Sequence, residues 1–139
     1  MRAQFSVVSQ SVAVDRFTNR LSLFNIIEAF QAPRFPLLIP EVVIVSFVRR
    51  DENEPNVFET DLVVNLNGNR IGMSHLHVNF EGRLYVRLIA NFQNLPVLTA
   101  GDLEFTIPLP NGDPIRTSIP VIQIPVAPVP VVPVQAVRH

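Results

Sequence analysis

Residues 57–92 read VFETDLVVNLNGNRIGMSHLHVNFEGRLYVRLIANF, and apolar and polar residues alternate along three runs within this stretch. The runs are separated by Asn67-Gly68 and Glu81-Gly82, pairs that are typical of tight turns between antiparallel strands. Successive side chains of a strand point to opposite faces, so each run has one apolar face. The stretch therefore predicts a three-stranded antiparallel meander over Val57–Phe92, and with it an all-β fold.

The register of this meander follows from the same alternation, because a one-residue slip would move every side chain to the opposite face. A three-residue turn at each position pairs Phe58 with Leu76 and Val78 with Leu84, which keeps the apolar side chains together. The opposite face is then predicted to be polar. It carries a row formed by Glu59, His75 and Arg87, with His77 beside Tyr85.

Upstream, the pattern predicts three further strands. Residues 3–14 alternate loosely and predict a strand that bends near Ser9–Ser11. Residues 21–30, LSLFNIIEAF, also fit a helical spacing, but the run is short and rich in β-branched and aromatic residues, which favours a strand. Three prolines make residues 31–41 an extended crossing segment between sheets. The almost continuously apolar run 42–48 predicts a strand covered on both faces.

The remaining segments also predict strands separated by loops and turns. Residues 49–56, RRDENEPN, are charged and predict a solvent-exposed loop. Leu103–Leu109 alternates, residues 111–114 (NGDP) predict a turn, and Ile115–Ile124 predicts a returning strand. About eight short strands separated by turn signals indicate an antiparallel β-sandwich, with a β-barrel as the alternative.

Composition limits the function classes. The 139 residues are 47% apolar and 17% charged with a net charge of −1, which argues against disorder and against nucleic-acid binding. Cysteine is absent, which excludes disulfides and thiolate metal sites. Polar residues interrupt every apolar run of the first twenty residues, and no run approaches the roughly 20 residues of a membrane span. We therefore expect a soluble, cytoplasmic protein that binds neither nucleic acid nor membrane.

The C-terminal segment is unusual, because residues 119–139 read IPVIQIPVAPVPVVPVQAVRH. Repeated prolines predict an extended arm over residues 125–139, following a sandwich domain over residues 1–124. Valines between the prolines are costly to expose, so we expect the arm to pack on its own domain or on a neighbouring subunit; a ligand for a polyproline-binding domain is a third alternative. The predicted partner-binding residues are Val126, Val129, Val131, Val132 and Val134.

The candidate chemistry is sparse. His75, His77 and Glu59 are weak candidates for metal ligands, because His-x-His on a strand supplies two imidazoles on one face. Arg87 in the same predicted row would repel a cation, and paired surface charges are the more ordinary interpretation. The sequence contains no Gly-x-Ser-x-Gly and no phosphate-binding glycine loop. We predict neither an enzyme nor a cofactor.

Four features together resemble a known family. They are LSLFNIIEAF (21–30), APRFP (32–36), the apolar strand 42–48 and AGDLEFTIPLPNGDPI (100–115). In these features, over residues 15–124, the chain resembles a family of small bacterial β-sandwich proteins known only as a domain of unknown function. The resemblance implies a fold and no functional residues, and the proline-rich end departs from it.

Two function hypotheses remain. The first is a non-enzymatic assembly protein, such as a capsid-decorating, tail or filament subunit, whose arm contacts its own or a neighbouring subunit in a homo-oligomer. The second is a small binding module that recognises a protein or small ligand through the polar sheet face or through the loop at residues 49–56.

Overall fold

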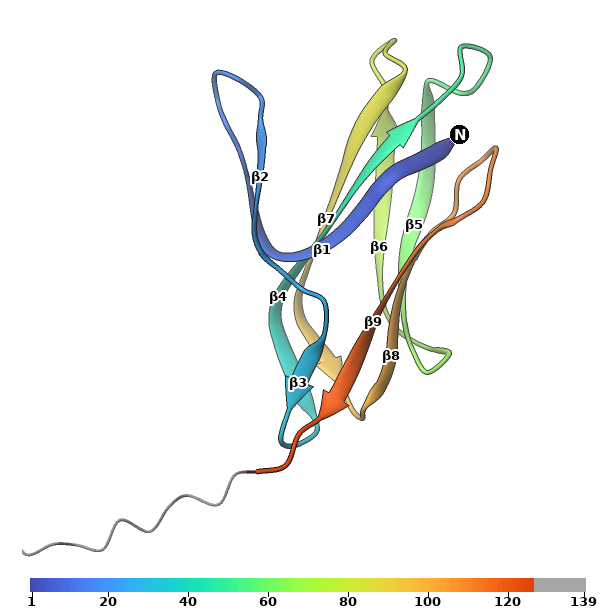
Figure 1. Ribbon diagram of the computed structural model, residues 1–139. Helices are drawn as coiled ribbons and strands as arrows, with labels where there is room; N and C mark the ends of the chain where they lie inside the picture. The colour runs from blue at the N-terminus through green and yellow to red at the C-terminus, as the bar shows by residue number, and fades with distance from the viewer. Residues whose placement is uncertain (127–139) are drawn as a thin grey trace, which may run out of the picture.

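The computed structural model describes residues 1–126, which form an all-β structure as the sequence predicts (Figure 1). Among these residues, no helix is long and apolar enough to cross a membrane. In chain order the strands are β1 (Arg2–Val14), β2 (Leu21–Ile26), β3 (Phe30–Ala32), β4 (Leu37–Arg49), β5 (Val57–Leu66), β6 (Asn69–Asn79), β7 (Tyr85–Val97), β8 (Gly101–Ile107) and β9 (Ile115–Gln123).

The strands form two sheets that share one hydrophobic core (Figure 1). One sheet has the order β2-β1-β4-β7, and the other has the order β3-β9-β8-β5-β6. Neighbouring strands are antiparallel except for β3 and β9, which are parallel. The core takes residues from both sheets, which places it between them. Its largest fully buried side chains include Phe80, Phe105, Ile44, Leu62 and Leu103.

The run at residues 21–30 is extended, as predicted, but it contributes to two strands where we expected one. β2 belongs to the first sheet and β3 to the second, so the chain changes sheets between Ile26 and Phe30. Asn25 has a φ of 54°, a left-handed conformation that asparagine tolerates, just before β2 ends. The chain returns to the first sheet with β4. The predicted crossing between sheets is therefore confirmed, although residues 37–41 belong to β4.

The β5–β6 hairpin is confirmed, but its predicted register is wrong by two residues. Phe58 pairs with Val78, not with Leu76. Asn67 and Gly68, with φ values of 50° and 83°, form a two-residue turn, and the strand pairing beside it has a bulge between Val64 and Asn65. The turn alone would direct the polar face of β6 into the core, and the bulge reverses this. Because the net error is an even number of residues, the predicted apolar face is correct.

The third strand of the predicted meander is misplaced. β7 pairs with β4 in the opposite sheet, so the predicted pairing of Val78 with Leu84 does not occur. The chain crosses at the predicted turn over residues 80–82, where Arg83 N donates to Phe80 O at 2.9 Å and the Phe80 ring is buried between the sheets. The apolar face of β7 would point into the same core whichever of the two sheets the strand joined. Alternation alone therefore could not decide which sheet β7 joins.

β1 bends where the sequence predicts it, and its pairing with neighbouring strands changes at the bend. It pairs with β4 as far as Ser9↔Val43 and then with β2, and Figure 1 shows β1 bending before the β1–β2 hairpin. The Ser9 hydroxyl donates to Ser11 O at 3.3 Å across the bend. At the hairpin tip, Asn19 O accepts from Arg87 Nη2 at 3.1 Å, which ties the tip to β7.

The charged segment at residues 49–56 is not simply the solvated loop that we expected. Arg50 is buried, and its Nε and Nη1 donate to Arg83 O and Glu54 O at 2.8 and 3.1 Å. Its guanidinium also lies 5.3 Å from the centre of the Phe80 ring. Arg50 therefore connects the β4–β5 loop to the turn before β7.

Candidate interaction surface

The polar face of the β5–β6 hairpin brings together three of the predicted candidates with one residue that the prediction left out. Glu59 pairs with His77, and Asp61 pairs with His75. His75 Nδ1 lies 2.8 Å from Asp61 Oδ1, while Glu59 Oε1 lies 3.6 Å from both His75 Nε2 and His77 Nδ1. The hydrogen bond that His75 donates to Asp61 raises the pKa of His75 above its ordinary value, because it stabilises the imidazolium. All four side chains are exposed.

Two residues of the predicted polar row lie elsewhere. Arg87 and Tyr85 belong to β7, which joins the opposite sheet, so neither neighbours the two histidines. The Tyr85 ring stacks on Phe47, which in turn stacks on Phe5, with centroids 5.5 and 5.8 Å apart. These rings form an aromatic row on the outer face of the first sheet. Sequence reasoning missed this row because it placed β7 beside β6.

Whether Glu59, His75 and His77 bind a metal ion stays a prediction. Among residues 1–126, no group of three or more His, Cys, Asp or Glu side chains is arranged to hold a metal ion. Glu59, His75 and His77 are near one another, and His75 forms a hydrogen bond with Asp61, while the contacts of Glu59 with the two imidazoles are longer. Exposed contacts of this kind contribute little to stability.

The predicted partner-binding valines fall mostly outside the described residues. Val126 is described and is 54% exposed, three residues after the end of β9. Just before Val126 the chain lies beside β3, where Ile124 N donates to Ala32 O at 3.0 Å. Val129, Val131, Val132 and Val134 lie outside the described part.

A groove that sequence reasoning missed opens where β1 leaves β4. Beyond the pair Ser9↔Val43, β1 turns toward β2, while β4 continues along β7 to Leu37↔Val97. Within residues 1–126, no strand pairs with Leu37–Val42 on the side opposite β7. An unpaired strand edge presents free N–H and C=O groups, apart from Pro40, which has no N–H, so another strand can be added there.

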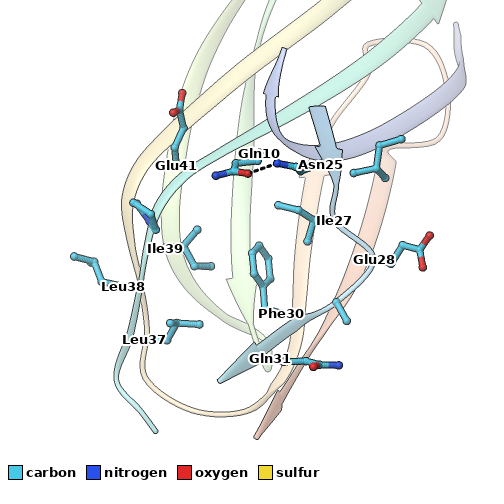
Figure 2. Close-up of a pocket in the computed structure, with 13 residues that line it drawn as sticks. Gln10, Asn25, Ile27, Glu28, Phe30, Gln31, Leu37, Leu38, Ile39 and Glu41 are labelled. Atoms are coloured by element: carbon cyan, nitrogen blue, oxygen red, sulfur yellow. Dashed lines mark hydrogen bonds between the residues drawn. The ribbon is translucent and has the colours of Figure 1, made fainter. Parts of the chain in front are cut away.

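The floor of the groove is apolar and continuous with the core. Its volume is about 590 Å³, and residues 25–31 form the wall that faces β4 (Figure 2). Figure 2 shows Ile27, Phe30, Leu37 and Ile39 directed toward the cavity, whereas Leu38 points away from it. Ile39 is buried in the core, and the other three side chains are half-buried and packed against it. An apolar side chain entering here would extend the core.

Polar side chains surround this floor. At one end, Asn25 Nδ2 donates to Gln10 Oε1 at 2.6 Å, and Gln31 lies at the other end (Figure 2). Two carboxylates, Glu28 and Glu41, also line the groove, and Glu41 Oε1 accepts from Asn91 Nδ2 at 3.1 Å. An apolar floor beside a free strand edge is the geometry that binds an extended peptide segment.

One signal in the sequence could have revealed the groove. The core-facing residues of β4 change from odd positions, Leu37 and Ile39, to even positions, Val42 and Ile44, and the change falls at Pro40. On β7, Asn94 has a φ of 55° at the corresponding place. A change of phase at a proline indicates that a strand bends and that its pairing can change there.

Comparison with known proteins places the chain in a family. No curated protein and no solved structure matches it. One family model, described as a family of unknown function (DUF6941), matches residues 4–122. This range includes every residue that lines the groove and the whole polar face of the β5–β6 hairpin. The match confirms the resemblance to an uncharacterised family: the chain belongs to the DUF6941 family, whose function is unknown.

Proposed function

We propose that this chain is a non-enzymatic structural subunit that assembles with copies of itself through its apolar C-terminal arm, residues 125–139. The observation that carries the proposal is the exposure of apolar side chains where the arm begins. Ile122 and Val126 are 41% and 54% exposed, and the sequence after them continues with valines between prolines. Covering several valines contributes several kcal/mol at ~25 cal/mol per Å², which is enough to dock a segment.

A second apolar surface supports contacts between proteins. Phe5 and Tyr85, at the two ends of the aromatic row, are 42% and 52% exposed on the outer face of the first sheet. Contiguous apolar surface of this kind commonly marks a protein–protein contact. A capsid-decorating, tail or filament subunit would present such surfaces on a compact body. A cytoplasmic location stays a prediction from the sequence.

The test is the solution mass of the full chain and of a variant that ends at Val126. The shortened chain keeps every strand and the whole core described above. At equal concentration, light scattering should show an oligomer for the full chain and a smaller species for the shortened one. Circular dichroism on both proteins establishes that the shortened chain is folded. Equal masses for two folded proteins would refute the proposal.

A binding module is the alternative, and the paired row of Glu59, Asp61, His75 and His77 favours it. Two imidazoles and two carboxylates form an exposed polar surface on adjacent strands. On this alternative, the chain ending at Val126 keeps its oligomeric state, and a ligand binds to the hairpin. Addition of zinc tests the simplest ligand: an unchanged melting temperature would exclude a zinc site on this face.

A further inference from the structure

We propose that the groove between β4 and residues 25–31 receives residues 127–132 of a second copy of this chain, added as a strand beside Leu37–Val42. This inference rests on the proposed assembly role and specifies the surface that the arm occupies. The free edge of β4 supplies backbone groups for pairing, and the floor around Phe30 supplies an apolar surface for every second side chain.

The spacing of prolines in the arm matches a site that is open on one side. In an extended segment, the N–H groups of successive residues point to alternate sides. Pro128 and Pro130 would face one side, while Ala127, Val129 and Val131 would present N–H groups to the other. Pro133 falls on the pairing side and has no N–H, so the pairing ends at Val132. Such a segment can pair along one edge only. It fits beside β4, and its proline edge prevents a further strand from being added.

The direction in which the chain leaves β9 favours a second copy over the same copy. β9 runs parallel to β3 and passes Ala32 at its end, whereas the groove is lined by Phe30, Gln31 and the residues before them. To enter its own groove, the arm would have to reverse. Residues 125–139 contain no Gly, Asn, Asp or Ser, the residues that favour reversals besides proline.

The composition and charge of the arm also match those of the groove. The arm between residues 126 and 134 contains only Val, Pro and Ala, which suits a floor formed by Ile27, Phe30 and Leu37. Arg138 is the charged side chain of the arm, and Glu28 and Glu41 line the groove. Arg138 follows the docked segment and is opposite in charge to these carboxylates.

The experiment compares two single substitutions in the full chain. Val131→Pro removes an N–H from the edge proposed to pair with β4, and Val132→Pro removes one from the opposite edge. Each substitution creates one Pro-Pro pair, so they are matched in stiffness and hydrophobicity. The readouts are solution mass by light scattering and amide hydrogen exchange over residues 37–42, measured on unsubstituted chain and on both variants.

We expect Val131→Pro to weaken association about tenfold and to speed exchange of the groove-facing amides in residues 37–42, because a backbone hydrogen bond is lost. Val132→Pro should stay within about twofold of the unsubstituted chain in both readouts. If the full chain assembles but the two variants behave alike, this inference fails and the proposed function stands. If residues 37–42 are protected in a monomer, the second copy is the wrong occupant. If the chain does not assemble and residues 37–42 are not protected, both this inference and the proposed function fail.

Discussion

Replacing Arg50 by methionine should lower the free energy of unfolding by about 3 kcal/mol. The arginine is 7% exposed, and its guanidinium donates to two backbone carbonyls, Arg83 O at 2.8 Å and Glu54 O at 3.1 Å. A hydrogen bond from a charged donor is worth about 1.5–3 kcal/mol. We take the lower value for each of the two, because methionine refills the apolar space over Phe80 and removes a buried charge.

The assay is urea unfolding followed by circular dichroism at one fixed protein concentration, because association would otherwise change apparent stability. For a chain of this size, about 3 kcal/mol corresponds to a melting temperature lower by roughly 10 °C. Arg49→Met is the matched control, since Arg49 is exposed at the end of β4 and should change stability by less than about 0.5 kcal/mol. The reasoning is refuted if the two variants unfold at the same urea concentration.

Three further predictions concern the loops and the polar face. Gly101→Ala should destabilise the protein by about 2 kcal/mol or more, because a Cβ there would overlap the side-chain amide of Asn67 at a φ of 146°. Gly82→Ala, at a φ of 77° with no atom within 4 Å, should cost only the backbone strain of about 1 kcal/mol, and equal losses in thermal melts would contradict this account. Asp61→Asn should lower the pKa of His75 toward its ordinary value in an NMR titration, and an unchanged titration would show that Asp61 is not the cause. Since the folded-state pKa of His75 is raised, its contribution to stability is fully present below about pH 6.5 and is lost as pH rises through the folded-state pKa.

The sequence predicted local features well, because they depend on nearest neighbours. Alternation identified the faces of β5, β6 and β7, and Leu62, Val78 and Leu88 are all in the core. The bend of β1 near Ser9 and the crossing between sheets were also predictable, because proline and a break in alternation mark them.

Pairing between distant strands was not predictable. A turn such as residues 80–82 can close a hairpin within one sheet or lead into the opposite sheet, and both place the same side chains in the core. The aromatic row of Phe5, Phe47 and Tyr85 and the environment of Arg50 depend on that choice. The groove was missed for the same reason, because it exists only where β1 separates from β4.

The most direct test of the account is disulfide trapping between the groove of one copy and the arm of another. The chain contains no cysteine, so Gln31→Cys in the groove can be mixed with a variant carrying Val129→Cys, Val131→Cys or Val132→Cys. We expect at least one mixture to form a disulfide-linked dimer with one copy of each variant. This dimer should form faster than the dimer obtained when the same arm variants are mixed with Glu59→Cys, which is exposed on the distant β5–β6 face. Equal trapping at Gln31 and Glu59, or no mixed dimer, would contradict the account.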